Sequence, residues 1–97
     1  MLIKEHRTPD GKIIIALCDK EVIGRKLNEN GAELDLSSEF FKGKEKKECE
    51  IGDILRNSWA CNIAGEKSIA LALKEGVIQK ENVKQISGIP YAISMTL

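Results

Sequence analysis

An apolar run at positions 12–18, KIIIALC, constrains the fold of this chain more than any other feature. A strand with one solvated face alternates apolar and polar residues, so a strand as apolar as Ile13–Leu17 is expected in the middle of a sheet, covered on both faces. Leu2 and Ile3 predict a strand before it. The intervening TPDG at 8–11 has the proline and glycine of a tight turn. The first twenty residues therefore predict a β-hairpin.

The middle of the chain predicts short elements. Asp19 is expected to cap a short helical turn that ends at Gly24, and AELDLS at 32–37 alternates well enough for a short strand. Helical segments are predicted for SEFF at 38–41 and for IGDILRNSW at 51–59.

The main helix is predicted after the turn WACNIAG at 59–65. Ile69, Ala72 and Leu73 recur at a helical spacing, and Gly76 stands where a left-handed C-terminal cap belongs. VKQIS at 83–87 and YAISMTL at 91–97 predict two last strands. With strands at both ends and helices between them, residues 1–97 are expected to form one α+β domain. Its sheet should be mixed or antiparallel and packed by two to three helices.

The charges of the chain balance. Fifteen basic and fifteen acidic residues cancel, whereas a protein that binds phosphates without specificity is usually clearly basic. Any nucleic-acid role must therefore come from a local patch or from shape. The most charged segment, KGKEKKECE at 42–50, is interpreted as a solvated loop or helix end, with a docking patch as the alternative.

Other function classes find little support. No run of eighteen apolar residues exists and the N-terminus does not resemble a signal peptide, so we expect a cytoplasmic protein without a membrane span. Cys18, Cys49 and Cys61 have no Cys-x-x-Cys spacing, so we expect reduced thiols and neither a metal site nor a cofactor. His6 has no obvious carboxylate or nucleophile partner, and enzymatic function is the minority interpretation.

Two turns contain the candidate binding residues. Asn62, Gly65 and Lys67 precede or open the main helix, where they either cap it or expose amides to a phosphate, a carboxylate or an RNA backbone. They lack the glycine-rich loop and the preceding strand of a nucleotide-binding fingerprint. Gly88, Pro90 and Tyr91 either shape a strand connection or present the Tyr91 ring for stacking on a base.

The segments CNIAGEKSIALALKEGVI and ISGIPYAI, together with the Cys18-Asp19 step, carry a family resemblance. In their order and spacing along nearly the whole chain, they resemble a small archaeal family known as domain of unknown function 424. The resemblance implies a housekeeping protein connected with translation or RNA. Relatives often have His where this chain has Tyr91, and Tyr cannot replace His as a base near neutral pH.

The leading hypothesis is a non-enzymatic binding module that docks on RNA or on a ribosomal or translation-factor partner, through Asn62, Gly65, Lys67, Gly88, Pro90 and Tyr91. One alternative is a small-molecule or anion-binding protein, or an enzyme, that uses the helix N-terminus at residues 62–67. Another is a protein-interaction subunit that uses an aliphatic sheet face or edge, for example as a homodimer.

Overall fold

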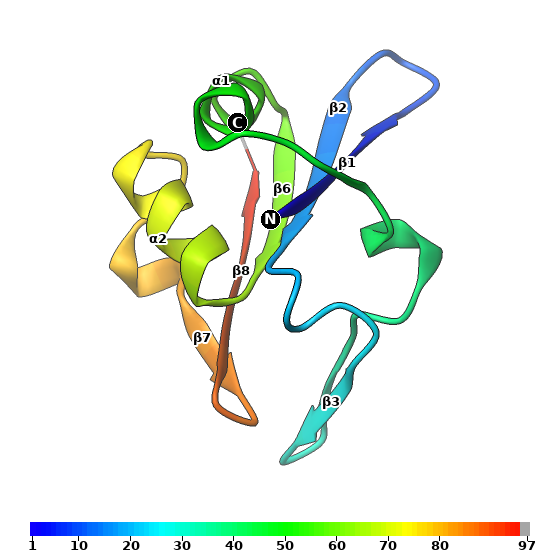
Figure 1. The fold of residues 1–97 in the computed structure, drawn as a ribbon, viewed down its shortest axis with the longest axis vertical. Helices are drawn as coiled ribbons and strands as arrows, with labels where there is room; N and C mark the ends of the chain where they lie inside the picture. Colours follow the sequence, from blue (N-terminus) through cyan, green and yellow to red (C-terminus); the bar gives the residue numbers. More distant parts are fainter. Residues whose placement is uncertain (96–97) are drawn as a thin grey trace.

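The computed structural model describes residues 1–95 as an α+β domain built on a six-stranded sheet (Figure 1). The strands of this sheet are β1 (Leu2–Arg7), β2 (Ile13–Cys18), β5 (Lys44–Glu45), β6 (Ala60–Ala64), β7 (Lys84–Ile86) and β8 (Ile89–Met95). The other elements are the hairpin β3 (Lys26–Glu29) and β4 (Ala32–Asp35), the helices α1 (Glu48–Arg56) and α2 (Glu66–Lys74), and the 3-10 turns η1 (Glu39–Phe41) and η2 (Lys80–Asn82). The strand order is β5-β1-β2-β6-β8-β7, and only β2 and β6 run parallel. The predicted fold class is confirmed, and the sheet is mixed.

The apolar strand β2 lies in the interior, as expected. It pairs with β1 on one side and with β6 on the other, and each residue from Ile15 to Cys18 is 0% exposed. Ile15 and Leu17 belong to the core beneath α1 and α2, whereas Ala16 and Cys18 belong to a second core on the opposite face. Both faces of this strand are therefore covered.

The two faces of the sheet are covered by different elements. On one face, α1 and α2 pack Ile51, Leu55 and Ile69 against the strands. On the other face, Leu27 of the β3–β4 hairpin and Phe41 of η1 cover part of the sheet. Figure 1 shows α2 and β3 on opposite sides of β6 and β8. On this second face the C-terminal part of β8 stays uncovered, because Ile93 and Met95 are 61% and 55% exposed.

Two predictions along the chain are wrong. Residues 60–64 form β6 rather than a turn. Ala60 and Ala64 lie on one face of the strand and the buried Cys61 and Ile63 on the other, so the sequence shows no alternation of apolar and polar residues. The helix α1 begins at Glu48, three residues before its predicted start, and ends at Arg56. Residues 20–24 form the predicted turns, in which Val22 donates to the Asp19 carbonyl and Arg25 donates to the Val22 carbonyl.

The C-terminal end of α2 agrees with its prediction. Gly76 donates to the Leu73 carbonyl, Val77 donates to the Ala72 carbonyl, and Ile78 folds back into the helix-side core. Both C-terminal strands are present, although Thr96 and Leu97 of the predicted last strand lie outside the described residues. Within residues 1–95, neither helix is long and apolar enough to cross a membrane.

Candidate functional site

The carboxyl ends of β2 and β6 form the candidate site. Because these two strands are parallel, the residues that follow them, Asp19 and Gly65, lie side by side at one edge of the sheet. The carboxyl ends of parallel strands are frequent ligand sites, especially where a helix begins directly after a strand. Here α2 begins at Glu66, directly after Gly65.

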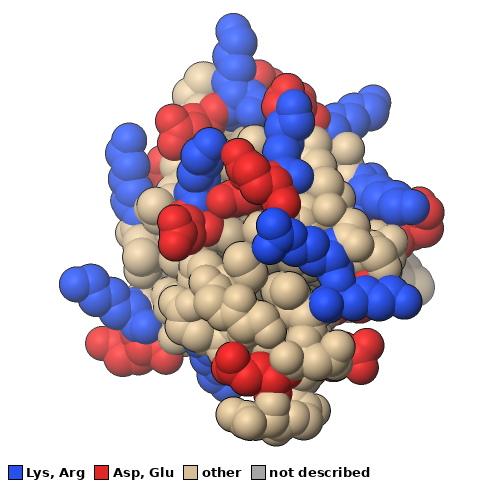
Figure 2. Space-filling view, turned by 60° about the horizontal axis from the view of Figure 1, so that its bottom comes forward, with Lys and Arg blue, Asp and Glu red and all other residues tan. Residues whose placement is uncertain are grey.

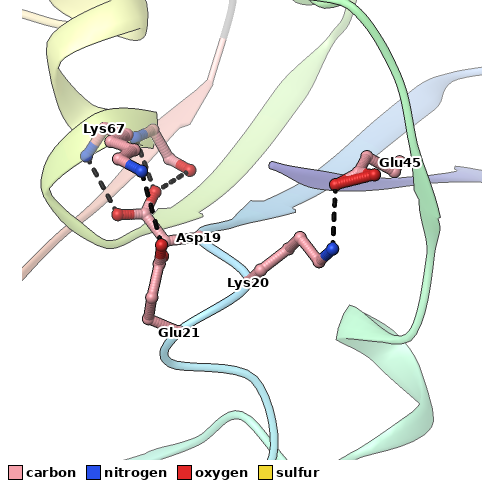
Figure 3. Close-up of polar contacts among 6 residues, drawn as sticks. Asp19, Lys20, Glu21, Glu45 and Lys67 are labelled. Atoms are coloured by element: carbon pink, nitrogen blue, oxygen red, sulfur yellow. Dashed lines mark hydrogen bonds and ion pairs between the residues drawn. The ribbon is translucent and has the colours of Figure 1, made fainter.

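The carboxylate of Asp19 occupies the N-terminus of α2 (Figure 3). Its Oδ2 accepts the Lys67 N–H at 3.0 Å, and its Oδ1 accepts both the Ser68 N–H at 2.8 Å and the Ser68 hydroxyl at 2.7 Å. Asp19 is only 5% exposed, and Ser68 is fully buried. We call this arrangement the Asp19 cap. It uses the amide donors that an external phosphate or carboxylate would need.

Gly65 makes this close approach feasible. A Cβ at position 65 would lie 2.4 Å from the Asp19 Cγ, and the backbone φ of 106° is one that only glycine adopts without strain. The Gly65 N–H also donates to the Pro90 carbonyl at 2.8 Å. The turn before the helix therefore joins the ends of β2 and β6 to the start of β8.

Asn62 does not cap α2, contrary to the capping interpretation. It lies inside β6, half-buried, opposite Ala16 of β2 and Ile93 of β8. The preceding strand, expected to be missing, is present as β6. Sequence reasoning missed Asp19 as the cap because its helix lies 48 residues further along the chain. An aspartate directly after the buried β2 strand was the available signal.

The other predicted residues are only partly brought together. Gly65 and Pro90 are hydrogen bonded. Tyr91 pairs with Ala64 and is half-buried against the core on the face that the β3–β4 hairpin and η1 cover. Lys67 is exposed beside them, and Gly88 lies in the turn between β7 and β8. The structure therefore places most of these residues around one corner of the sheet but leaves Asn62 within it.

A cavity of about 270 Å³ lies at this corner. Its walls carry three carboxylates and two cations, and its lining residues are Asp19, Glu21, Val22, Arg25, Glu66, Lys67 and Ile89. Lys67 Nζ lies 3.3 Å from the Glu21 carboxylate. A hydrogen bond from its own backbone, helped by Lys67, lowers the pKa of Glu21. This balance of charge gives no attraction for an anion.

Paired charges continue over this side of the molecule. Figure 2 shows Lys and Arg interspersed with Asp and Glu around an uncharged area, without a region of one sign. Lys20 bridges to Glu45 of β5 at 3.2 Å (Figure 3). By contrast, Lys44, Lys46 and Lys47 are exposed and form no ion pair with any residue from 1 to 95. We call these three residues the lysine segment.

The groups considered for catalysis are engaged in structural contacts. Burial, helped by the charge of Asp19, raises the pKa of the Cys18 thiol to about 11. Burial also raises the pKa of Cys61, although a hydrogen bond with Ser58 opposes this shift. The His6 ring stacks on Phe40 with centroids 4.4 Å apart and donates to the Phe40 carbonyl at 3.0 Å. In residues 1–95, no three His, Cys, Asp or Glu side chains are grouped to hold a metal ion.

Comparison with other proteins identifies relatives of this chain. The family model described as "Protein of unknown function (DUF424)" matches residues 6–97. The crystal structure of an uncharacterized conserved protein from Methanopyrus kandleri is similar, with a TM-score of 0.81 and 24% identity. That alignment covers 99% of this chain and 90% of the Methanopyrus chain, and at this identity it establishes the fold alone. No curated protein matches the chain.

Proposed function

This chain belongs to the DUF424 family of proteins of unknown function, and from that premise we propose that it is a non-enzymatic binding module. The Cys18 and Cys61 thiols are buried and the N-terminal amides of α2 already have an acceptor, which supports this proposal. A thiol must ionise and be reached to act as a nucleophile, and Cys18 and Cys61 are buried with raised pKa values. The helix amides that could hold an anionic substrate bind Asp19 instead.

The partner that we propose is RNA, or a ribonucleoprotein of the translation apparatus, in the cytoplasm. The connection with translation comes from the family resemblance. The contact surface is proposed from the lysine segment, and that single observation carries the RNA assignment. Lys20, Lys42 and Lys67 form ion pairs with Glu, whereas Lys44, Lys46 and Lys47 are three lysines within four residues that are unpaired within residues 1–95 and can meet phosphates. The other lysines unpaired in this described part are more widely spaced along the chain.

The proposed RNA contact differs from the binding residues predicted at 62–67 and 88–91. At the α2 N-terminus, the Lys67 and Ser68 amides already donate to Asp19, so they are not available to a ligand. Glu21 compensates the charge of the Lys67 ammonium group. Residues 42–50 carry four lysines against three glutamates, a local net charge of one positive unit in a chain of zero net charge. Such a small patch predicts weak binding with a shallow salt dependence.

The test is a titration of labelled single-stranded RNA with the protein over a salt series. Three phosphate contacts predict a slope of about −2 in log K against log salt, at roughly 0.7 per contact. Reversing the charges in K44E/K46E/K47E should abolish binding. The matched control, K26E/K74E/K80E, changes the total charge equally at exposed lysines that form no ion pair within residues 1–95. Equal weakening by both triple variants would reject the lysine segment as the site.

Sedimentation of the native protein from cell lysate addresses the partner itself. Migration with ribosomal particles that ribonuclease and moderate salt abolish is expected, because the proposed contact is ionic and depends on RNA. A protein that stays at the top of the gradient under all conditions would overturn the connection with translation.

A protein-interaction role is the second candidate function. It is favoured by the exposure of Ile93 and Met95, the large hydrophobic side chains that residues 1–95 leave in solvent. Because side chains alternate along a strand, Ile93 and Met95 lie on one face of β8, where a partner could cover both. They lie at the opposite edge of the sheet from β5 and the lysine segment, so both roles are compatible.

A further inference from the structure

The outer edge of β8 has no strand partner over its second half. β8 pairs with β6 from Tyr91 to Met95, but with β7 only from Ile89 to Tyr91. Figure 1 shows the short β7 beside only one end of β8. Within residues 1–95, no strand therefore lies on this side of Ile93 and Met95. We call this stretch the open edge.

The hydrogen-bonding phase of β8 shows which backbone groups face outward. The Pro90 carbonyl accepts from Gly65, so Pro90 points its backbone groups toward β6. In an antiparallel ladder this direction alternates, which turns Ala92 and Ser94 toward β6 and turns Ile93 and Met95 outward. The same two residues therefore expose apolar side chains and offer backbone donors and acceptors.

The other edges of the sheet are short or charged and the open edge is not. Within residues 1–95, the outer side of β1 also lacks a strand partner beyond Ile3, but it carries Lys4, Glu5 and Arg7. β5 has only two residues, Lys44 and Glu45, and the outer strand β7 has three, including exposed Lys84 and Gln85. Short length and charge are the usual ways in which proteins block edge-to-edge pairing. Residues 92–95, with the sequence AISM, contain no charge and no proline.

A hollow adjoins the end of the open edge that lies nearest to β7. A cavity of about 260 Å³ is lined by Glu81, Asn82, Lys84, Tyr91, Ala92 and Ile93. On the helix side, Ser94 donates to the Val77 carbonyl at 2.9 Å, which holds the chain after α2 against β8.

We propose that the open edge pairs with the same edge of a second copy of this chain, giving a sheet that continues across a two-fold axis. This inference rests on the second candidate function. An antiparallel pair of identical edges satisfies donors and acceptors reciprocally. With the axis near Ser94, Ile93 faces the Met95 side chain of the other copy, so each exposed hydrophobic side chain is covered.

Charge and size also favour a second copy. The chain has a net charge of zero, so two copies do not repel each other at long range. A single strand pair with two apolar side chains per copy is a small interface, which predicts a weak, concentration-dependent dimer. The two lysine segments would lie at the outer ends of the continued sheet, because β5 forms the other edge.

Sedimentation velocity without RNA, over a concentration series to the solubility limit, tests this pairing. The wild type should shift toward a dimer as concentration rises, and I93K/M95K should remain monomeric with an unchanged far-UV spectrum. The control A32K/A70K adds the same charge at exposed alanines and should still dimerise. A monomeric wild type throughout, or equal dissociation of both variants, would overturn the proposal.

A cross-link locates the axis. In a Cys49→Ser background, S94C should form an intermolecular disulfide under mild oxidation, because residues at a non-hydrogen-bonded antiparallel position have adjacent Cβ atoms. Glu66→Cys on α2, an exposed site away from the edge, should form far less. Equal cross-linking of both variants would reject the β8 edge as the contact. RNA takes no part in these measurements, so their failure leaves the lysine segment untouched.

Discussion

The Asp19 cap and the open edge show opposite solutions to the same problem of unpaired backbone groups. At the start of α2, buried amides receive the carboxylate of Asp19 from the end of β2. At the end of β8, the outward groups of Ile93 and Met95 have no partner within residues 1–95. A helix terminus that already has an internal partner contributes stability, whereas an edge without one is available for binding. The most motif-like part of the sequence therefore serves the fold.

The largest effect is expected from Gly65→Ala. Its new Cβ would lie 2.4 Å from the Asp19 Cγ at a positive φ, so either the cap or the backbone must move. We expect a loss of about 4 kcal/mol in the free energy of unfolding, from backbone strain together with loss of the cap. Urea denaturation measures this loss.

Gly76→Ala is the matched control for this change. Gly76 also has a positive φ, but a Cβ there meets nothing within 4 Å. Its cost should be about 1 kcal/mol, which is the strain alone. Equal losses at both positions would mean that the contact with Asp19 is unimportant and that the Asp19 cap does not stabilise the start of α2.

Removal of the carboxylate should have the next largest effect. Asp19→Ala leaves the Lys67 and Ser68 amides and the Ser68 hydroxyl without their acceptor in a buried site, which predicts a loss of about 3 kcal/mol. Ser68→Ala should cost less, because the two amide bonds remain. The double variant should lose less than the sum of the single variants, since the two side chains share one hydrogen bond. Strict additivity would exclude the direct coupling.

Much of the fold could be predicted from the sequence because its signals are local. The apolar run in β2, the turn at 8–11 and Gly76 each act through residues close in sequence, and all three have the predicted role. The partner of Asp19 could not be predicted, because strand order determines that β2 ends beside β6. The open edge could not be predicted either, because it exists only where the neighbouring strand β7 is shorter than β8.

Alkaline pH should reveal the burial of Cys18 behind the cap. Its folded pKa of about 11 lies above the ordinary thiol value of 9.0, so unfolding favours loss of the proton. The thiol therefore stabilises the fold fully below about pH 9, and this contribution is lost as pH rises toward 11. Each pKa unit corresponds to about 1.4 kcal/mol, so we expect a decline of about 2 kcal/mol by pH 11.

Urea midpoints between pH 8 and 11 measure this decline. Cys18→Ala should have a lower stability at neutral pH but a flatter profile, because the titrating group is gone. Cys49→Ser, at the exposed cysteine, should keep the slope of the wild type. A wild-type slope in Cys18→Ala would assign the pH dependence to other groups.

The smallest effect separates two carboxylates that both contact Lys67. Asp19 accepts its buried backbone N–H, whereas Glu21 meets its ammonium group at the surface, where both side chains are more than half exposed. Because exposed ion pairs contribute little to stability, Glu21→Gln and Lys67→Ala should each lower the free energy of unfolding by less than any substitution above. Their double-mutant cycle should give a coupling that added salt removes. The coupling between Asp19 and Ser68 should persist in the same salt, because their hydrogen bond is buried. A salt-resistant Glu21–Lys67 pair would instead mean that the structural contacts of the Asp19 cap continue to the surface. This corner of the sheet would then be a rigid, non-binding part of the molecule.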